Sequence, residues 1–423
     1  MTSPKLPGPG TSTSPVAFPE IRVLNAPEEL TAAAHVFRSA MVGLPALHVV
    51  DEGVLGRLFE PARAFGAFDR GELVGTTNSH ASAIRVPGGF WLPQAAVTHV
   101  GVLPSHRRRG IAKAMLAAQL RQARMAGEPV ATLRATEGRI YGNFGYGVAT
   151  RVMDVDLVRS EARLRPGLEA AAIVSVEAAD QCWERLRQIF EGQAGPRVGA
   201  VSRGAIWWRA SLARVAIGPT RAYVAICGDA RGDSGYVRYH AASGGDWFES
   251  KDRVVIVDDL VAHDARAYVA LVGFLLDLDI AHRIVLPTRP LDDVLPLVLE
   301  DGRSMRVSAI RDETWLRLVD AEAAFAASSW AGAGADPVVL QIVDRLLPEN
   351  TVKLRCTAEG IERATRTPDI VADIGSVSAA YLGGTRWGQL AEAGRLEVGD
   401  RSAVARLDRL MGSPVLPHGG TLF

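Results

Sequence analysis

One continuous segment constrains the fold of this chain more than any other, because it reads as a strand, a basic turn and a helix in immediate succession. The apolar run over Gln94–Pro104 predicts a strand that ends at a proline, and an apolar stripe at helical spacing predicts a helix over Gly110–Ala126. Gly127 and Pro129 follow at positions typical of a helix end. The next strand is predicted at Val130–Arg134, so a strand–helix–strand unit forms the centre of the first domain.

The turn between this strand and this helix carries the residues best suited to bind an anion. It reads Arg107-Arg-Arg-Gly-Ile-Ala112. The first N–H groups of a helix have no intrahelical partner and carry partial positive charge, and a glycine lets a ligand approach the backbone. With three arginines beside them, these groups form a site suited to a pyrophosphate. The alternative is that the arginines are solvated and Gly110 makes an ordinary turn.

The length of 423 residues predicts two or three domains rather than one. Residues 1–19 are rich in Pro, Gly, Ser and Thr and are predicted to be a disordered tail. The order of predicted strands and helices divides the remainder into residues 20–158, 159–305 and 306–423. The middle range repeats the element order of the first without usable sequence identity, so we interpret it as a topological repeat.

Charge and cysteine content argue against several classes of function. The chain has 47 Lys and Arg against 47 Asp and Glu, and this zero formal charge gives no support to a nucleic-acid partner. Cys182, Cys227 and Cys356 are far apart, and the nine histidines form no metal-binding motif, so we expect neither disulfides nor a metal, and a cytoplasmic location. No apolar run is long enough to predict a membrane span.

Two segments together resemble the Eis (enhanced intracellular survival) family of GNAT N-acetyltransferases: Val102–Ala112, with the basic turn, and Glu137–Gly147, which reads Glu-Gly-Arg-Ile-Tyr-Gly-Asn-Phe-Gly-Tyr-Gly. The resemblance extends to the chain length and to Ala380–Gly384, a segment of the family's sterol-carrier-like domain. It implies an α+β fold with two tandem GNAT-like mixed-sheet domains, the second degenerate, followed by a sterol-carrier-protein-like α/β domain.

The resemblance also implies an activity. Members of this family transfer an acetyl group from acetyl-CoA to primary amines of aminoglycosides and to some lysines, and they form hexamers. We therefore expect acetyl-CoA as the co-substrate, a small-molecule or lysine amine as the acceptor, and a homo-oligomer, specifically a hexamer. No metal, membrane or nucleic acid is expected to take part.

By the same resemblance, individual residues receive roles. Tyr141 matches the general acid that protonates the leaving thiolate, and the carboxylate of Phe423 matches the general base. The residues expected to bind the coenzyme lie on the strand end, in the turn and on the far side of the site: Val100, Gly101, Val102, Arg107, Arg108, Arg109, Gly110, Ile111, Ala112, Lys113, Thr136 and Glu137.

Each of these roles has a structural alternative. Tyr141 lies among apolar and aromatic neighbours and could simply pack, and Tyr146 is a rival proton donor. Chain ends usually fray, which argues against a catalytic Phe423 on general grounds. His99 at the strand tip is either a base or a structural residue, and Glu137 is either a coenzyme contact or a helix cap.

Two departures from the family pattern concern the acceptor. Leu422 stands where the best-known members have an acidic residue, and Ala40–Pro45 lacks an aspartate that they carry. Asp51, Glu52 and Glu60 are nearby acids that could substitute. Because the family's two acids help to bind polycations, we hypothesise that this chain prefers a less cationic, more apolar amine.

A third departure lies in the second unit, where Asp258–Arg266 lacks the glycine and basic residues of the first turn. We predict that this unit binds no coenzyme and serves as a scaffold. One alternative function is a lipid- or sterol-binding carrier, which needs an apolar tunnel in residues 308–423, whereas we favour a filled core. Another is a regulatory protein with an inactive GNAT site, against which the intact Arg107–Ala112 turn and Tyr141 argue.

Overall fold

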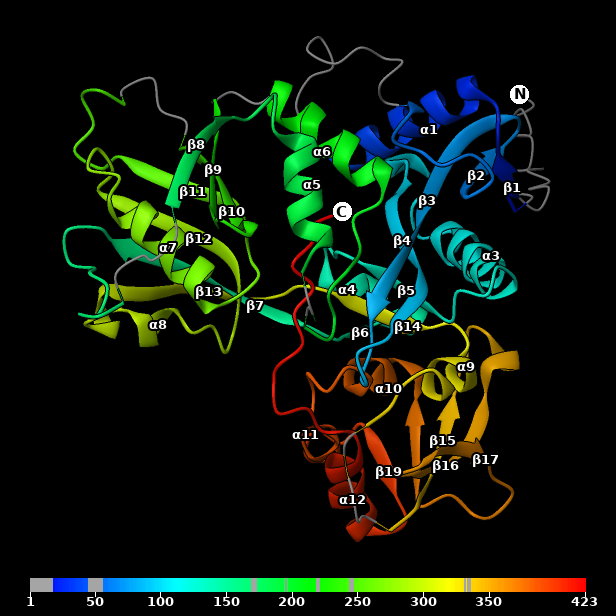
Figure 1. Cartoon of the computed structure of the whole chain (residues 1–423). Helices are drawn as coiled ribbons and strands as arrows, with labels where there is room; N and C mark the ends of the chain where they lie inside the picture. Colours follow the sequence, from blue (N-terminus) through cyan, green and yellow to red (C-terminus); the bar gives the residue numbers. More distant parts are fainter. Residues whose placement is uncertain are drawn as a thin grey trace, which may run out of the picture.

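The structure is a computed structural model that describes residues 18–44, 56–168, 173–193, 195, 197–217, 221–242, 247–330, 332 and 336–423. The tail predicted for residues 1–19 lies outside the described residues up to position 17, as do Pro45, Asp51 and Glu52. The described strands form three sheets, each of which contains both parallel and antiparallel pairs (Figure 1). Helices pack against them, which confirms the predicted α+β class.

The first sheet has seven strands in the order β1-β2-β3-β4-β5-β14-β6. Helix α3 packs on it and buries Ile111, Met115 and Leu120, whereas Met125, which the sequence pattern puts on the apolar stripe, is exposed. The sequence pattern predicts two separate strands at Leu73–Asn78 and Ser82–Val86, but the structure has the single strand β3, because pairing with β4 continues between them. The elements are β1 (Glu20–Leu24), α1 (Pro27–Ala40), β2 (Ala64–Asp69), β3 (Glu72–Arg85), β4 (Trp91–Val102), α3 (Ile111–Met125), β5 (Val130–Leu133), α4 (Gly138–Tyr141), β6 (Gly147–Val148) and β14 (Trp315–Leu318).

The second sheet also has seven strands, in the order β13-β7-β12-β11-β10-β9-β8. Its central helix α7 spans the residues that its apolar pattern predicts, and Asp264 caps its first turn. The elements are β7 (Arg151–Val158), β8 (Ile173–Ala178), α5 (Trp183–Glu191), α6 (Ala205–Ile217), β9 (Ala222–Asp229), β10 (Gly232–Ala241), β11 (Val254–Ala262), α7 (Ala265–Leu276), β12 (Arg283–Pro290), α8 (Leu295–Val298) and β13 (Met305–Asp312).

Two strands belong to a different sheet from the one expected from the predicted domain ranges, 20–158 and 306–423. Strand β7 follows the first unit in the chain but pairs with β12 and β13 of the second sheet. Strand β14 precedes the third domain but inserts between β5 and β6 of the first sheet. The expected assignment of these two strands is wrong, because sheet membership depends on long-range pairing that a local apolar pattern does not carry.

The two chain crossings between these sheets lie side by side. The chain leaves the first sheet at Ala149 and Thr150 and returns to it at Glu313 and Thr314. The Ala149 N–H donates to the carbonyl of Thr314 at 2.9 Å, and the Glu313 N–H donates to the carbonyl of Thr150 at 2.9 Å. The Thr150 hydroxyl accepts from the Thr314 N–H at 3.0 Å. The first two units are therefore joined at one hydrogen-bonded crossing point.

The third sheet has five strands in the order β17-β16-β15-β18-β19 and forms the last domain with four helices, below the first sheet in Figure 1. The helices predicted at Gly375–Leu382, Trp387–Ala393 and Asp400–Leu410 are all present, with ends shifted by one or two residues. The elements are α9 (Ala321–Ala326), β15 (Val338–Val343), β16 (Val352–Thr357), β17 (Gly360–Arg363), β18 (Ile370–Asp373), α10 (Ile374–Ala380), α11 (Trp387–Glu392), β19 (Leu396–Val398) and α12 (Arg401–Met411).

Side chains fill the core of the third domain. Leu340, Ile342 and Val377 are fully buried in a cluster that also takes in Ile84 of β3 and Leu316 of β14, so the domain shares a core with the first unit. This filled core is what we favoured over an apolar tunnel.

The third domain is docked by close backbone contact. A Cβ atom built on Gly147 of β6 would lie 2.2 Å from the carbonyl oxygen of Gly375 in α10. At Gly384 it would lie 2.3 Å from the carbonyl oxygen of Ala149, which explains the second glycine of the Ala380–Gly384 segment. Only glycine allows these approaches, so the two glycines fix the distance between the domain and the first sheet.

Candidate active site

The first sheet opens between β4 and β5. These parallel strands pair only from Gln94 to Ala96 on β4, and beyond that point β4 continues to Val102 without β5 beside it. The opposite edge of β4 pairs with β3, with an irregularity between Thr76 and Asn78, where His99 adopts φ +52°. We call this divergence the first opening. It leaves the backbone of Val100–Val102 available for an extended ligand to pair with, as an added strand would.

The N-terminus of α3 lies at the mouth of the first opening. Gly110 is the N-cap residue at φ +80°, and as a glycine it has no side chain to cap the helix. The Arg107 guanidinium donates to the carbonyl of Ala40 at 2.9 Å, and Arg109 forms an ion pair with Asp69 at 2.9 Å, which lowers the pKa of the Asp69 carboxyl. Two of the three predicted arginines therefore hold the turn in place.

The remaining residues of the predicted phosphate site lie at the surface or support it. Arg108, at φ +63°, and Lys113 have exposed side chains. Ala112 is half-buried, and Ile111 is buried in the core beneath the turn. The arrangement offers free helix amides with two cationic side chains at their rim, which suits an anionic ligand.

The far side of the first opening is built by the residues that follow β5. Thr136 and Glu137 are exposed there. The Glu137 carboxylate accepts from the backbone N–H of Arg139 at 3.2 Å and pairs with the Arg139 side chain at 3.3 Å, so it caps α4, as its structural alternative supposed. Its role in coenzyme binding stays a prediction.

Tyr141 is buried at the end of α4 and contacts Tyr146 edge to face, with 5.9 Å between the ring centroids. Burial raises the pKa of both phenols, so both stay protonated at neutral pH. Within the described residues, no hydrogen bond is made by the Tyr141 hydroxyl, and the Tyr146 hydroxyl is enclosed without a partner. Either phenol could donate a proton, and neither is held by a structural hydrogen bond.

His99 lies between two aromatic rings, with centroid distances of 4.8 Å to Phe37 and 4.6 Å to Phe59. These contacts fix the bulged strand tip against α1. The structural alternative for His99 therefore accounts for its position.

The end of the chain, residues 412–423, which we call the terminal segment, runs between the first two units (Figure 1). Arg203 donates to the carbonyl of Gly420 at 3.0 Å, Trp207 donates to the carbonyl of Leu422 at 2.5 Å, and Arg134 donates to the carbonyl of Thr421. The Arg134 guanidinium also lies 5.7 Å from the ring centroid of Phe423. The expectation that chain ends fray does not hold here.

A cavity of about 700 Å³ lies between the first two units and the terminal segment. Thr136 and Leu422 line it, so the far side of the first opening and the chain end meet in one space, whereas Tyr141 and Phe423 themselves are not among its lining residues. Five arginines and four acids line its wall: Arg134, Arg203, Arg238, Arg289, Arg311, Asp258, Asp259, Asp312 and Glu313.

Each acid on this wall already has a donor from the protein. Asp259 accepts from Arg203 at 2.6 Å, Asp258 pairs with His240 at 3.0 Å, and Glu313 pairs with Arg134 at 3.2 Å. The indole N–H of Trp315 donates to Asp312. The cavity therefore presents engaged carboxylates and one more arginine than acids, with Arg289 and Arg311 paired to Asp293 and Asp154 behind the wall.

The second unit repeats the opening but not the binding groups. Strands β11 and β12 pair for three residues, from Val254 to Ile256 on β11, and then diverge, which we call the second opening. At the adjacent helix α7, the Asp264 carboxylate accepts from the N–H of Ala267 at 2.8 Å, where α3 has no side-chain cap. A carboxylate at this end repels an anion electrostatically.

Several residues of the site escaped the sequence analysis: Arg134, Arg203, Trp207 and Glu313. No local motif marks them, because each acts through contacts with the terminal segment more than a hundred residues away. Only a pattern that linked the chain end to these positions could have found them.

The described residues contain no helix with the length and apolar character needed to cross a bilayer. They also contain no cluster of three His, Cys, Asp or Glu side chains placed to bind a metal.

Comparison with known proteins gives the same three-part division. Residues 20–149 and 199–318 match acetyltransferase (GNAT) domain models, and residues 321–419 match a sterol carrier protein domain model.

Whole relatives match over most of their length. The N-acetyltransferase Eis of Mycobacterium tuberculosis is 32% identical over 83% of this chain and 86% of its own. An uncharacterised N-acetyltransferase of Streptomyces avermitilis is 32% identical over 86% of this chain and 90% of its own. The crystal structure of Eis1 from Mycobacterium abscessus superposes with a TM-score of 0.87 at 41% identity, covering 96% of this chain and all of that one. The chain therefore belongs to the Eis-type GNAT N-acetyltransferases.

Proposed function

We propose that this N-acetyltransferase uses acetyl-CoA to acetylate a primary amine of a small molecule or lysine, and that it does so in the first opening. The observation that carries the proposal is the uncapped N-terminus of α3 at the mouth of a strand divergence. The helix amides, with Arg108 and Lys113, would hold the pyrophosphate, and the backbone of Val100–Val102 would pair with the pantetheine arm.

The proton transfers are assigned to the two predicted catalytic groups. The amine nitrogen attacks the thioester carbonyl, the carboxylate of Phe423 accepts the proton that the nitrogen loses, and the Tyr141 phenol gives a proton to the thiolate that leaves. The backbone N–H of His99 or Val100 would stabilise the oxyanion of the tetrahedral intermediate. The raised pKa of the buried Tyr141 phenol supports its role as a donor, since the group stays protonated until the thiolate forms.

For the acceptor, we propose an amine less cationic than an aminoglycoside. The cavity wall carries more arginines than acids, and every acid there has a donor already, so a polycation would find no free carboxylate among the described lining residues. Leu422 adds no charge at the chain end. Glu60, the described member of the nearby acids, is engaged by the N–H of Ala81 at 3.2 Å.

The remaining parts of the proposal concern the second unit and the assembly. Asp264 at the start of α7 supports a second unit that binds no coenzyme and serves as a scaffold. A homo-hexamer in the cytoplasm is proposed from the family resemblance, and the three unpaired, buried cysteines support a reducing compartment. Light scattering of the purified protein tests the hexamer directly.

The test follows free thiol release from acetyl-CoA with a panel of amines. The panel runs from kanamycin and neomycin through a histone-like peptide to hydrazides and arylalkylamines. Thiol release is measured for Tyr141→Phe and for a chain that lacks Phe423, beside the intact enzyme. Tyr146→Phe is the matched control, because it removes the hydroxyl of the neighbouring buried tyrosine. We expect a loss of about 100-fold or more in kcat for the first two variants, because general acid–base catalysis contributes that much.

Each outcome decides a different part. If Tyr146→Phe loses activity and Tyr141→Phe does not, Tyr146 is the donor. Efficient turnover of kanamycin with simple monoamines left untouched would refute the proposed acceptor class. Absence of acetyl-CoA binding would refute the proposed donor.

A further inference from the structure

Glu313 stands at the point where the chain crosses from the second sheet back to the first, and its carboxylate accepts hydrogen bonds from four donors in three parts of the chain. It accepts from the Thr150 hydroxyl at 2.8 Å and from Arg134 at 3.2 Å, which places it against the first crossing and the end of β5. It also accepts from the backbone N–H groups of Gly419 and Gly420 at 2.8 and 2.9 Å. The Glu313 side chain is 3% exposed.

The two glycine amides belong to the turn that sets the direction of the last three residues. Gly420 adopts φ +63°, a conformation that favours glycine, and the chain ends three residues later. Arg134, the cationic partner of Glu313, also donates to the carbonyl of Thr421 and lies over the ring of Phe423. The charge of Glu313 therefore acts on the chain end by two routes, through the amides of the turn and through Arg134.

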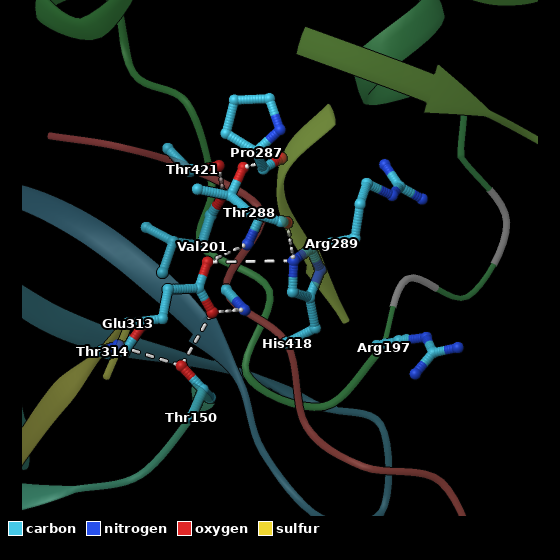
Figure 2. A network of polar contacts seen from close by, with 12 residues as sticks. Thr150, Arg197, Val201, Pro287, Thr288, Arg289, Glu313, Thr314, His418 and Thr421 are labelled. Carbon is cyan, nitrogen blue, oxygen red and sulfur yellow. Dashed lines mark hydrogen bonds and ion pairs between the residues drawn. The ribbon is translucent and has the colours of Figure 1, made fainter. Parts of the chain in front are cut away.

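The terminal segment lies in the second opening, the place equivalent to the proposed coenzyme site of the first unit. The His418 ring donates from Nε2 to the carbonyl of Thr288 on β12 at 2.9 Å (Figure 2). The 700 Å³ cavity and a second cavity of about 530 Å³ share the lining residues Leu260, Arg289, His418 and Gly420. The terminal segment therefore divides the second opening into two cavities. The second unit holds the chain end in the place where the first unit is proposed to hold the coenzyme.

We propose that Glu313 is a positioning residue for the terminal carboxylate: it fixes the Gly419–Gly420 turn and Arg134, and the second opening serves as the holder of the terminal segment. This inference rests on the proposed role of the Phe423 carboxylate as the general base. In this proposal Glu313 acts through the Gly419–Gly420 turn and Arg134, and it has no role of its own in the chemical step.

The alternative is that Glu313 only stabilises the crossing, as a buried carboxylate paired with an arginine often does. The two readings differ in what a neutral isostere changes. A purely stabilising Glu313 would leave the kinetic constants of the folded enzyme intact. A positioning Glu313 would lower kcat and leave the acetyl-CoA KM unchanged, because the hydrogen-bond partners of Glu313 are not among the residues proposed to bind the coenzyme.

The experiment is a double-mutant cycle between Glu313→Gln and deletion of Phe423, with kcat and both KM values measured for the folded fractions. Asp344→Asn is the matched control, since Asp344 is fully buried, pairs with Arg317 at 2.5 Å and makes no contact with the terminal segment. We expect Glu313→Gln to lower kcat about tenfold or more with the acetyl-CoA KM within twofold, and to add nothing once Phe423 is absent.

The outcomes separate this inference from the proposed function. Full activity after deletion of Phe423 overturns both. The inference alone is overturned if deletion of Phe423 abolishes activity but Glu313→Gln leaves kcat unchanged. The same holds if Glu313→Gln lowers kcat no more than Asp344→Asn does. If Glu313→Gln does not fold, Glu313→Asp, which keeps the charge but shortens the reach, replaces it in the same cycle with the same criteria.

Discussion

The buried Glu313 carboxylate keeps its negative charge because the surrounding hydrogen-bond donors stabilise it. Burial by itself would raise the pKa of the Glu313 carboxyl, but the charge of Arg134, the nearby His418 and the hydrogen bonds from Gly419 and Thr150 outweigh it and bring the pKa to about 2. Burial lowers the pKa of His418, so this ring contributes its charge only in acid. The arrangement makes the crossing sensitive to protonation.

The first prediction concerns this protonation. The pKa of Glu313 falls from an ordinary 4.5 to about 2 in the folded chain, so its contribution to stability is complete above pH 4.5 and is lost as the pH falls toward 2. The shift corresponds to at most roughly 3 kcal/mol. The difference in free energy of unfolding between the intact enzyme and Glu313→Gln, measured with urea from pH 6 to pH 3, should therefore shrink with acidity. A difference that stays constant over this range would contradict the assignment.

At the scale of elements, the contrast between the N-termini of α3 and α7 supports the proposal that only the first GNAT unit binds the coenzyme. Both helices follow a strand that diverges from its parallel neighbour, and both bury an apolar face. Helix α3 has Gly110 at its N-cap, whereas α7 has Asp264, whose side chain caps the first turn. A negative ligand is therefore favoured at the N-terminus of α3 and disfavoured beside the Asp264 carboxylate at the N-terminus of α7.

The second prediction concerns Gly110→Ala. Space for the methyl group exists, since the nearest atom to an added Cβ, on Phe18, is 3.7 Å away, but φ +80° is unfavourable for alanine. Relaxation of the turn should displace the first amides of α3 and raise the acetyl-CoA Kd about tenfold or more, with a smaller effect on kcat. Calorimetric titration measures the Kd, and an unchanged value would separate this turn from the coenzyme.

The third prediction concerns Asp264→Ala. Removal of this cap should destabilise α7 by about 1 kcal/mol, which urea unfolding detects. The coenzyme stoichiometry should remain one per chain, because the terminal segment still lies in the second opening. A second equivalent bound by the intact enzyme or by this variant would refute the scaffold role of the second unit.

Local sequence patterns predicted the elements that local forces determine. Helix α7 spans Ala265–Leu276, as its apolar run predicts, and α3 ends before Gly127, whose φ of +74° suits the stop. The basic turn was predicted because its chemistry is continuous in sequence. The sheet positions of β7 and β14 and the residues that hold the chain end could not be predicted, since each depends on contacts between distant segments.

At the scale of the whole molecule, the third domain acts as a support for the first sheet and the terminal segment. Its helix α10 contacts β6 and β14, and its core is continuous with theirs. The domain thus stiffens the strands beside the crossing from which the chain end is held.

The fourth prediction concerns this docking. Gly147→Ala should destabilise the enzyme by about 2 kcal/mol or more, because the added methyl group meets backbone atoms of α10 at 2.2 and 2.6 Å that can move only with the domain. Gly142→Ala is the control, since nothing lies within 4 Å of its added Cβ, and it should change stability by less than about 0.5 kcal/mol. Equal midpoints of thermal unfolding for the two variants would contradict the close docking.

The exchange of strands between the first two sheets also sets the order in which the protein can be completed during synthesis. Strand β14 separates β5 from β6, so the sheet that carries the first opening stays incomplete on the ribosome until Leu318 has been added. Domains usually fold one after another as the chain emerges, from the N-terminus onward. Here the first unit must wait for the second, and a gene fragment that encodes either one alone leaves a sheet without one of its strands. For expression, fusion or recombination, residues 20–318 form one indivisible block.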